Sequence, residues 1–150
     1  MKIVIERIKE GYVKINENKV LSINKGLLLF VGICKNDSIQ EIEWAVNKIL
    51  NLRIFDDNQG KLNLSVLDVS GDILVISNFT LCADIKKGNR PSFDNSEEKV
   101  KAIEKFNFFV NKLKESNLKV IEGEFGAYME VYHVNSGPVT IFLDTKEKFR

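Results

Sequence analysis

The stretch Asn135–Thr140, with the sequence NSGPVT, lies near the C-terminal end of the chain. It falls inside a segment whose pattern otherwise predicts a β-strand. Proline donates no hydrogen bond to a β-ladder, so a strand that contains Pro138 must lie at a sheet edge, carry a bulge or be interrupted. Gly137 has no Cβ, which removes the usual clash with a following proline ring. By itself the stretch is compatible with a tight turn between two strands, or with a rigid backbone probe presented to a ligand.

Length and composition indicate one globular domain over residues 1–150, with 44% hydrophobic and 29% charged residues. A formal net charge of +1 predicts no global attraction to nucleic acid, so RNA binding would need a local basic patch, and we expect no DNA partner. No apolar run approaches the roughly 18 residues of a membrane span, and the N-terminal charges are unlike a signal peptide. We therefore expect a cytoplasmic protein without a membrane partner.

The two cysteines, Cys34 and Cys82, lie far apart, lack CxxC spacing and accompany a single histidine. This pattern supports neither a structural zinc site nor a disulfide framework. The Gly-rich fingerprints of phosphate and dinucleotide sites are also missing. We expect no metal and no cofactor.

The order of the hydrophobic patterns predicts an α+β fold: a single β-rich domain with two main helices. Its sheet is expected to be mainly antiparallel or mixed, or to be barrel-like. The continuous apolar run over 27–33 predicts a central strand covered on both faces. A second buried strand, over 73–81, turns polar at its C-terminal end. No alternating βαβ order is apparent. The other expected strands cover 2–8, which ends before Gly11, a hairpin over 12–23, and then 119–122, 128–134 and 139–143.

Two amphipathic helices are predicted from apolar residues at helical spacing. The first covers 39–51 and follows an Asp37-Ser38 cap. The second covers about 96–117, where Asn95 or Ser96 supplies the cap and acidic residues occupy the first turn.

Candidate nucleophiles gather at the end of the second buried strand, where Ser77, Thr80 and Cys82 lie close in sequence. The single histidine, His133, is expected to be a core residue of an apolar strand face, and no G-x-S-x-G elbow surrounds Ser77. An enzyme built on this chain would therefore use backbone N–H groups and hydroxyls more than titratable side chains. A hydrolase based on Cys82 remains an alternative.

Three segments in register, Ser77–Leu81 (SNFTL), Gly88–Phe93 (GNRPSF) and Asn135–Thr140, closely resemble the D-aminoacyl-tRNA deacylases, also called D-tyrosyl-tRNA deacylases. The resemblance extends over essentially the whole chain. Further matching segments are Arg53–Phe55, Gly60–Ser65 and Phe125–Ala127.

The resemblance implies a hydrolase that cleaves the ester of D-aminoacyl-tRNA, and of glycine mischarged on tRNA, to release the amino acid and tRNA. It implies a homodimer with its active sites at the interface. Gly137 and Pro138 match a Gly-cis-Pro motif that reaches into the other subunit's pocket, where its carbonyls contact the substrate's α-amino group and leave no room for an L side chain. The alternative is a non-catalytic tRNA-binding module on the same fold.

The resemblance also assigns roles to the Ser77–Leu81 segment. Ser77 and the Phe79 N–H would orient the ester and stabilise its oxyanion. Thr80 is expected to act as a pocket hydroxyl, because no base adjoins it, and the 2′-hydroxyl of the terminal adenosine to assist the attacking water. Asn78 replaces the family's glutamine, which puts the hydrogen bond of that position in doubt.

The remaining site residues follow from the same resemblance or from charge. Phe125 and Met129 match pocket residues, although either fits a core position equally well. Lys86, Lys87 and Arg90 are candidate contacts to tRNA phosphates. Lys146, Lys148 and Arg150 form a second, weaker group of candidates.

Overall fold

The computed structural model of the chain describes residues 1–149. Within them a mixed sheet has the strand order β2-β1-β3-β6-β7, with β8 paired to β1, and β4 and β5 form a small separate sheet. The strands are β1 (Lys2–Ile15), β2 (Lys19–Ile23), β3 (Gly26–Gly32), β4 (Phe55–Asp56), β5 (Leu62–Leu64), β6 (Asp72–Ser77), β7 (Val120–Glu122) and β8 (Met129–Asp144). The helices are α1 (Ile39–Asn51), α2 (Lys99–Lys114), α3 (Thr145–Lys148) and the 3₁₀ turn η1 (Phe79–Cys82). The predicted α+β class is confirmed.

Strand β1 organises the sheet. Its N-terminal half pairs with β3, its C-terminal half with β2, and nearly its whole length with β8. The predicted break at Gly11 is wrong, because the strand runs through it. A Cβ on Gly11 would lie 3.1 Å from Tyr132 O and 3.2 Å from His133 Cβ, so the glycine allows β8 to approach closely and does not mark a turn.

Strand β8 runs through Asn135–Thr140 without interruption, so the interpretation of that stretch as a turn between two strands is wrong. The irregularity lies instead in the pairing with β1, whose register shifts between Glu6 and Ile8 and again between Ile8 and Glu10. A bulged edge strand of this kind is one of the places where a sheet accommodates proline.

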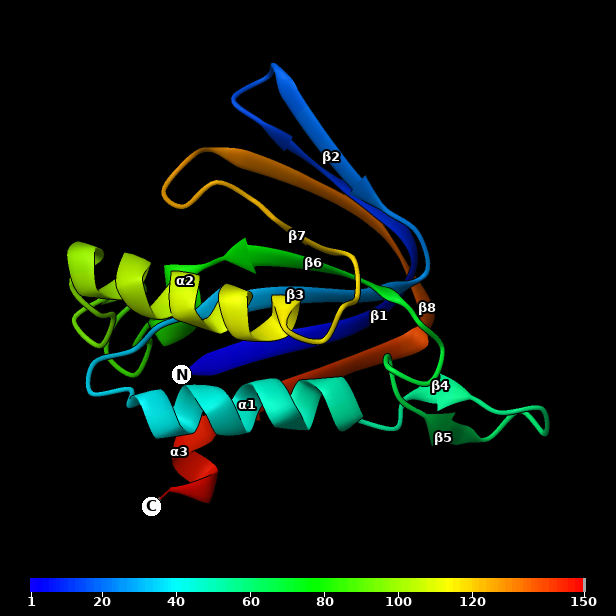
Figure 1. Cartoon of the computed structure of the whole chain (residues 1–150). Coiled ribbons are helices and arrows are strands. Elements are labelled where there is room, and N and C mark those ends of the chain that lie inside the picture. The colour runs from blue at the N-terminus through cyan, green and yellow to red at the C-terminus, as the bar shows by residue number, and fades with distance from the viewer. Residues whose placement is uncertain (150) are drawn as a thin grey trace.

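The other half of the sheet is parallel. Strand β3 pairs with β6, and β6 with β7, through crossovers that contain α1 and α2. The expectation of no βαβ order is therefore wrong, since β6, α2 and β7 form such a unit. Figure 1 shows α1 and α2 side by side over one face of this parallel half.

The two main helices differ in how well their ends were predicted. Helix α1 has the predicted bounds, and Ser38 and Glu41 form a reciprocal capping box at its start. Helix α2 begins at Lys99 and ends at Lys114, so it is shorter at both ends than the predicted 96–117, and its N-cap is Glu98 without a side-chain bond. The predicted cap is used elsewhere, because Ser96 Oγ donates to Phe79 O at 3.2 Å.

Two hydrophobic cores lie on opposite faces of the sheet. On β3, Leu27 and Leu29 are buried in the core under α1 and α2, whereas Leu28 is buried in the second core with Leu74 of β6. Full burial of such a side chain contributes about 1.5–3 kcal/mol. The run over 27–33 is thus covered on both faces, as predicted, which fixes the carboxyl ends of β3 and β6.

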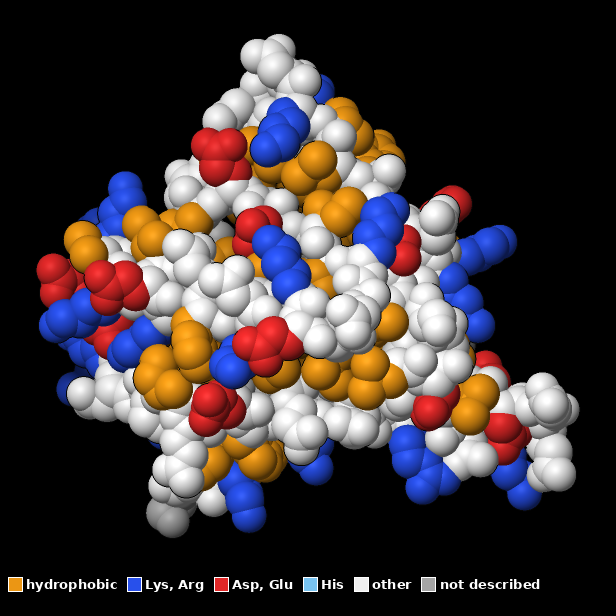
Figure 2. All heavy atoms as spheres, viewed as in Figure 1, with side chains coloured by type: hydrophobic (Ala, Val, Ile, Leu, Met, Phe, Trp, Pro, Cys, Tyr) orange, Lys and Arg blue, Asp and Glu red, His pale blue; other side chains and the backbone are white. Residues whose placement is uncertain are grey.

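The visible surface is mixed in charge. Figure 2 shows acidic and basic side chains interspersed over the face that carries α1 and α2. None of the helices within residues 1–149 is long and apolar enough to cross a membrane.

Candidate functional site

A cavity of about 380 Å³ opens where the parallel strands β3 and β6 end. Its walls come from the ends of those strands, the residues just before and within α2, and the loop that leads into β8. Five of the predicted site residues line it: Ser77, Asn78, Phe79, Phe125 and Met129. Crevices at the carboxyl ends of parallel strands are common ligand sites, because the scaffold fixes side chains there while leaving them accessible.

One wall of the cavity is formed where β6 ends and η1 begins. The predicted strand over 73–81 is wrong after Ser77, since residues 79–82 form η1. Asn78 makes the last bond to β3, from its N–H to Val31 O at 2.8 Å. Phe79 is the first residue of η1, where a helical N–H has no partner within the helix. The cavity wall thus combines the Ser77 hydroxyl with a backbone donor.

Asn78 acts as the cap of η1. Its Oδ1 accepts from Thr80 N at 3.2 Å and from Thr80 Oγ1 at 2.5 Å. The shorter amide in place of glutamine is therefore committed to η1 through its carbonyl oxygen. Thr80 is exposed and does not line the cavity.

The Phe79 side chain is exposed and packs on the loop that follows η1. Its ring is 57% exposed and contacts Phe93 edge to face, with 5.0 Å between ring centroids. Phe79 thus lines the cavity as the first residue of η1.

The opposite wall is largely apolar. Phe125 packs edge to face on Phe106 at 5.6 Å, and Met129 packs against the second core. A Cβ on Gly123 would lie 2.6 Å from Met129 Sδ, which shows how closely this wall is packed. Phe125 and Met129 are therefore both packing residues and cavity residues.

Sequence reasoning missed two charged residues at the cavity, Lys99 and Glu97. Glu97, assigned there to the first turn of the second helix, precedes α2 and lines the cavity. Its carboxylate is 2.7 Å from Lys105 Nζ, and the hydrogen bond from that lysine lowers the pKa of Glu97. A glutamate before a helix has so ordinary an explanation that no sequence signal marked it.

The Asn135–Thr140 stretch lies outside the cavity of its own chain. The Gly137–Pro138 peptide bond is cis, and both residues are exposed. Arg7 Nε donates to Ser136 O at 2.8 Å, and Asn135 Oδ1 accepts from Val139 N at 2.9 Å. The exposed residues are thus held by bonds on either side.

Arg7 is the main support under this stretch. Its side chain also donates from Nη1 to Ile54 O at 3.0 Å and contacts Asp56 Oδ2 at 3.3 Å. Only 8% of Arg7 is exposed, so its guanidinium is bonded to internal partners.

The basic candidates occupy an exposed loop after η1. Lys86, Lys87 and Arg90 are all exposed, and the loop is closed at its base by paired backbone bonds between Asp84 and Ser92, at 2.8 and 2.9 Å. The second group is less available, because Lys146 Nζ lies 2.9 Å from Glu41 and donates to Asn36 O. Lys148 is exposed, and Arg150 lies outside the described residues.

Comparison with known families gives one match over nearly the whole chain. A family model described as D-Tyr-tRNA(Tyr) deacylase matches residues 4–144, nearly the whole chain. The chain belongs to this family. The family is one of enzymes, hydrolases that act on ester bonds, so the prediction of an enzyme is confirmed.

Individual relatives agree with the family. A D-aminoacyl-tRNA deacylase of Aquifex aeolicus is 53% identical over 147 residues, 98% of this chain and 99% of the relative. One of Thermosipho melanesiensis is 51% identical over 150 residues, covering 99% of this chain and all of the relative.

Two solved structures have the same fold. One is titled a c-Myc DNA unwinding element binding protein, with a TM-score of 0.90, 38% identity and coverage of 96% of this chain and 98% of that one. The other is titled a probable eukaryotic D-amino acid tRNA deacylase, with a TM-score of 0.83, 16% identity and coverage of 95% and 97%.

Two residues that could have supported another hydrolase chemistry are used elsewhere. His133 is exposed, not in the core, and its Nε2 lies 2.7 Å from Glu6 Oε2. Cys82 is fully buried and forms a disulfide with Cys34, so the expectation against a disulfide is wrong. Both cysteines of the chain are in this bond, which leaves no thiolate for a Cys82-based deacylase. Within residues 1–149 no group of three or more His, Cys, Asp or Glu could hold a metal ion.

Proposed function

We propose that this protein hydrolyses the ester bond of D-aminoacyl-tRNA and releases the free D-amino acid and tRNA. The observation that carries the proposal is the cavity at the ends of β3 and β6, which Ser77 and Phe79 line together with the apolar residues Phe125 and Met129. Ser77, Phe79 and Phe125 belong to the same family segments from which the resemblance was drawn. A cavity that is apolar with a few polar groups suits an aminoacyl moiety.

The chemistry would be attack of water on the ester carbonyl. The Phe79 N–H and the Ser77 hydroxyl would stabilise the oxyanion that forms, a contribution of about 3–4 kcal/mol per donor in other enzymes. The 2′-hydroxyl of the terminal adenosine of tRNA would assist the water. Thr80 is a poor nucleophile in this arrangement, because its hydroxyl donates to the amide oxygen of Asn78, which is not a base that could take its proton.

Selection against L-aminoacyl esters would come from Gly137 and Pro138, used in trans. Both residues are exposed and neither lines the cavity of its own chain, so they would act on the cavity of a second subunit in a homodimer. Their carbonyls would contact the α-amino group and leave no space for an L side chain. Glycine has no side chain to exclude, so glycine mischarged on tRNA would also be hydrolysed.

Exposed apolar side chains on β1 and β8 support the proposal of a homodimer. Tyr12 and Tyr132 stack with 4.6 Å between ring centroids, and each is more than a third exposed. Val134 and Phe142 of β8 are also exposed, at 47% and 57%. Clustered exposed apolar side chains favour a protein interface.

The tRNA would approach over the loop after η1. Lys86, Lys87 and Arg90 are exposed beside the cavity wall and would contact phosphates. A protein with this substrate would work in the cytoplasm.

A second candidate is a nucleic-acid-binding module without catalysis. The observation that favours it is the fold's likeness to the protein titled a c-Myc DNA unwinding element binding protein. Such a module would bind charged tRNA and leave the ester intact.

The deciding experiment measures release of tyrosine from D-tyrosyl-tRNA and from L-tyrosyl-tRNA. We expect rapid hydrolysis of the D-ester and survival of the L-ester. Equal rates for the two esters would refute the chiral function. Binding without release, unchanged in Ser77→Ala, would favour the module.

A further inference from the structure

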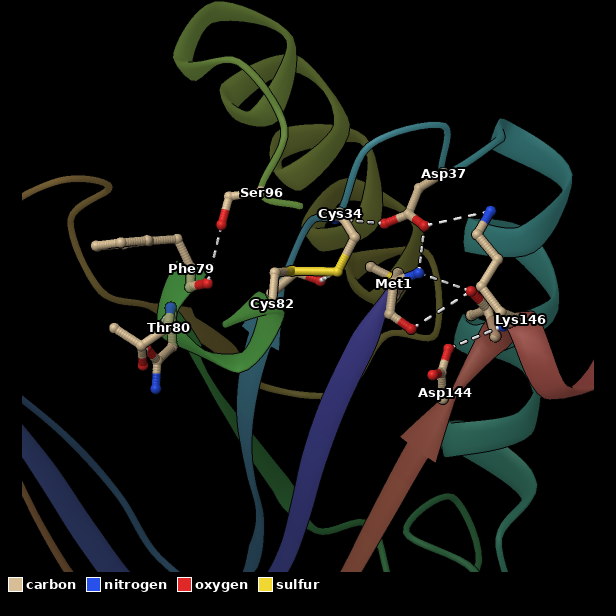
Figure 3. The surroundings of a disulfide bond; sticks show 12 residues. Met1, Cys34, Asp37, Phe79, Thr80, Cys82, Ser96, Asp144 and Lys146 are labelled. Atoms are coloured by element: carbon tan, nitrogen blue, oxygen red, sulfur yellow. Dashed lines mark hydrogen bonds and ion pairs between the residues drawn. A yellow bond between two sulfur atoms is a disulfide. The ribbon is translucent and has the colours of Figure 1, made fainter. Parts of the chain in front are cut away.

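The Cys34–Cys82 disulfide joins η1 to the segment after β3, close to Phe79 and Ser96 of the cavity lining (Figure 3). Cys82 is the last residue of η1, which supplies the Phe79 main chain. Cys34 lies in the segment between β3 and α1. We propose that this pair is a reversible thiol–disulfide modification site that braces the cavity, so that its oxidised form is the more active one.

On the Cys34 side, the disulfide is attached to a segment that is bonded to residues 95–97 of the cavity wall. Lys35 N donates to Asn95 O at 2.9 Å, Glu97 N donates to Ile33 O at 3.1 Å, and Cys34 pairs with Ser96 in an isolated bridge. Ser96 and Glu97 both line the cavity. Cys34 and this wall are therefore held together.

The Cys34 segment is itself firmly held. Asp37 Oδ2 accepts from Cys34 N at 2.7 Å. The other oxygen of Asp37 contacts the Met1 amino group, and it lies 3.7 Å from Lys146 Nζ. Asp37 is buried, so Cys34 is a fixed anchor for whatever is bonded to it.

On the Cys82 side, a backbone bond ties the beginning of η1 to the sheet. The bond from Asn78 N to Val31 O fixes the point where η1 leaves β6. At the other end, Ala83 N bonds to Thr80 O within the same turn, and the chain then enters the exposed loop after Asp84. The disulfide is thus the covalent tie at the downstream end of η1, and the bond from Ser96 to Phe79 O runs beside it.

The two sulfurs differ in access. Cys34 is half-buried, whereas Cys82 is 0% exposed. A dithiol reductant would therefore attack Cys34 Sγ as its thiolate, form a mixed disulfide there, and displace Cys82 as a thiolate that takes up a proton. The reductant's second thiol then attacks its own sulfur in the mixed disulfide, closes a cyclic disulfide and releases Cys34. A disulfide oxidant reverses both steps.

The proposed cytoplasmic location makes thiol–disulfide exchange relevant to this protein. Disulfides are rare where thiols are kept reduced, and those found there are usually transient, catalytic or redox-sensing. The chain has two cysteines, so no third thiol competes for either partner. The effect on catalysis rests on the proposed deacylase function, since it follows from the position of the Phe79 N–H.

The test uses the whole protein equilibrated in buffers of reduced and oxidised dithiothreitol. Thiol titration should count two free thiols in the reduced chain and none in the oxidised one. We expect kcat/KM for D-tyrosyl-tRNA to fall on the order of 10-fold on reduction, because small displacements of catalytic groups cost rates of that size or more. Hydrogen exchange at the η1 amides, measured without tRNA, should speed up in parallel.

The double variant Cys34→Ser, Cys82→Ala is the matched control. It should have the activity of the reduced protein under every buffer, and circular dichroism should confirm that it is folded. Equal kcat/KM and equal η1 exchange in the two redox states of the native chain would overturn the proposal, as would free thiols in the fully oxidised buffer. If neither state hydrolyses the ester, the deacylase proposal fails, while the exchange rates still decide whether η1 is braced.

Discussion

The wall at Ser77–Cys82, where β6 gives way to η1, and the stretch Asn135–Thr140, where β8 carries a cis proline, lie in different surroundings. The first closes one side of a cavity in its own chain, with its polar groups turned toward other polar groups of that chain. The second is exposed, distant from that cavity, and braced from beneath by Arg7. Under the proposed function, the catalytic half of the site would come from one chain, and the selective half would come from a second copy.

The catalytic half is tested most directly by Ser77→Ala. We expect kcat for D-tyrosyl-tRNA to fall by about 100- to 1000-fold with little change in KM, because an oxyanion donor acts mainly in the transition state. Single-turnover release of tyrosine measures it.

Thr80→Ala is its matched control. Asn78 Oδ1 keeps the bond from Thr80 N in this variant, so only one hydroxyl contact is lost. We expect a decrease of about fivefold, equivalent to about 1 kcal/mol. A dead Thr80→Ala beside an active Ser77→Ala would make Thr80 the nucleophile and contradict the mechanism.

The selective half is tested by Gly137→Ala. A Cβ there would lie 2.9 Å from both Arg7 Nη2 and Val139 Cγ2, at a φ of +135° that side chains disfavour. Displacing the stretch should lower D-ester hydrolysis on the order of 100-fold and raise the ratio of L-ester to D-ester rates. Both rates are measured with the same tRNA.

Gly60→Ala is the control, since Gly60 also has a positive φ but open space around it. If Gly137→Ala behaves like Gly60→Ala, the stretch does not act on substrate. His133→Ala should stay close to wild type, because the imidazole faces Glu6 and not the cavity. An inactive His133→Ala would instead indicate a general base.

The free energy of unfolding should depend on the ionised side chain of Glu41, in the first turn of α1. Burial by itself would raise the pKa of Glu41, but hydrogen bonds from Ser38, Lys146 and Thr145 lower it from 4.5 to about 2. A lowered pKa stabilises the folded state above about pH 4.5, and that stabilisation is lost as pH falls toward 2.

We expect Glu41 to contribute about 2–3 kcal/mol between those limits. Denaturant unfolding at pH 7 and pH 3 should therefore show a smaller difference for Glu41→Gln than for wild type. Glu43→Gln, exposed on the same helix, should keep the wild-type pH dependence. If both variants show the same pH dependence of the free energy of unfolding, Glu41 does not contribute to it.

How much the sequence predicted depends on how local each feature is. The strand over 27–33 and the helix cap at Asp37-Ser38 depend on neighbouring residues, and both are confirmed, with Ser38 as the N-cap. The start of α2 was wrong because Ser96 bonds to Phe79 O, a partner 17 residues away. The disulfide joins residues separated by 48 positions, which no spacing pattern predicts.

The site shows the same limit. The family resemblance groups Ser77, Phe79, Phe125 and Met129 in one pocket, and in the fold they line one cavity. Glu97 was missed, because only the packing of β3 against the residues before α2 brings it there. Its pairing with Lys105 joins residues eight positions apart across the start of a helix, which helical spacing does not predict.

The last prediction concerns the loop beside the catalytic wall. Replacing Lys86, Lys87 and Arg90 together with glutamine should raise KM by about 10-fold and leave kcat unchanged, because phosphate contacts position the tRNA without touching the ester. The salt dependence of log KM should become shallower by about 2, for roughly 0.7 per lost contact to single-stranded RNA. The matched triple variant Lys19→Gln, Lys61→Gln, Lys101→Gln removes the same charge from other exposed positions and should change neither quantity. Equal shifts in the two triple variants would assign tRNA binding to net charge, and the loop would then be no part of the site.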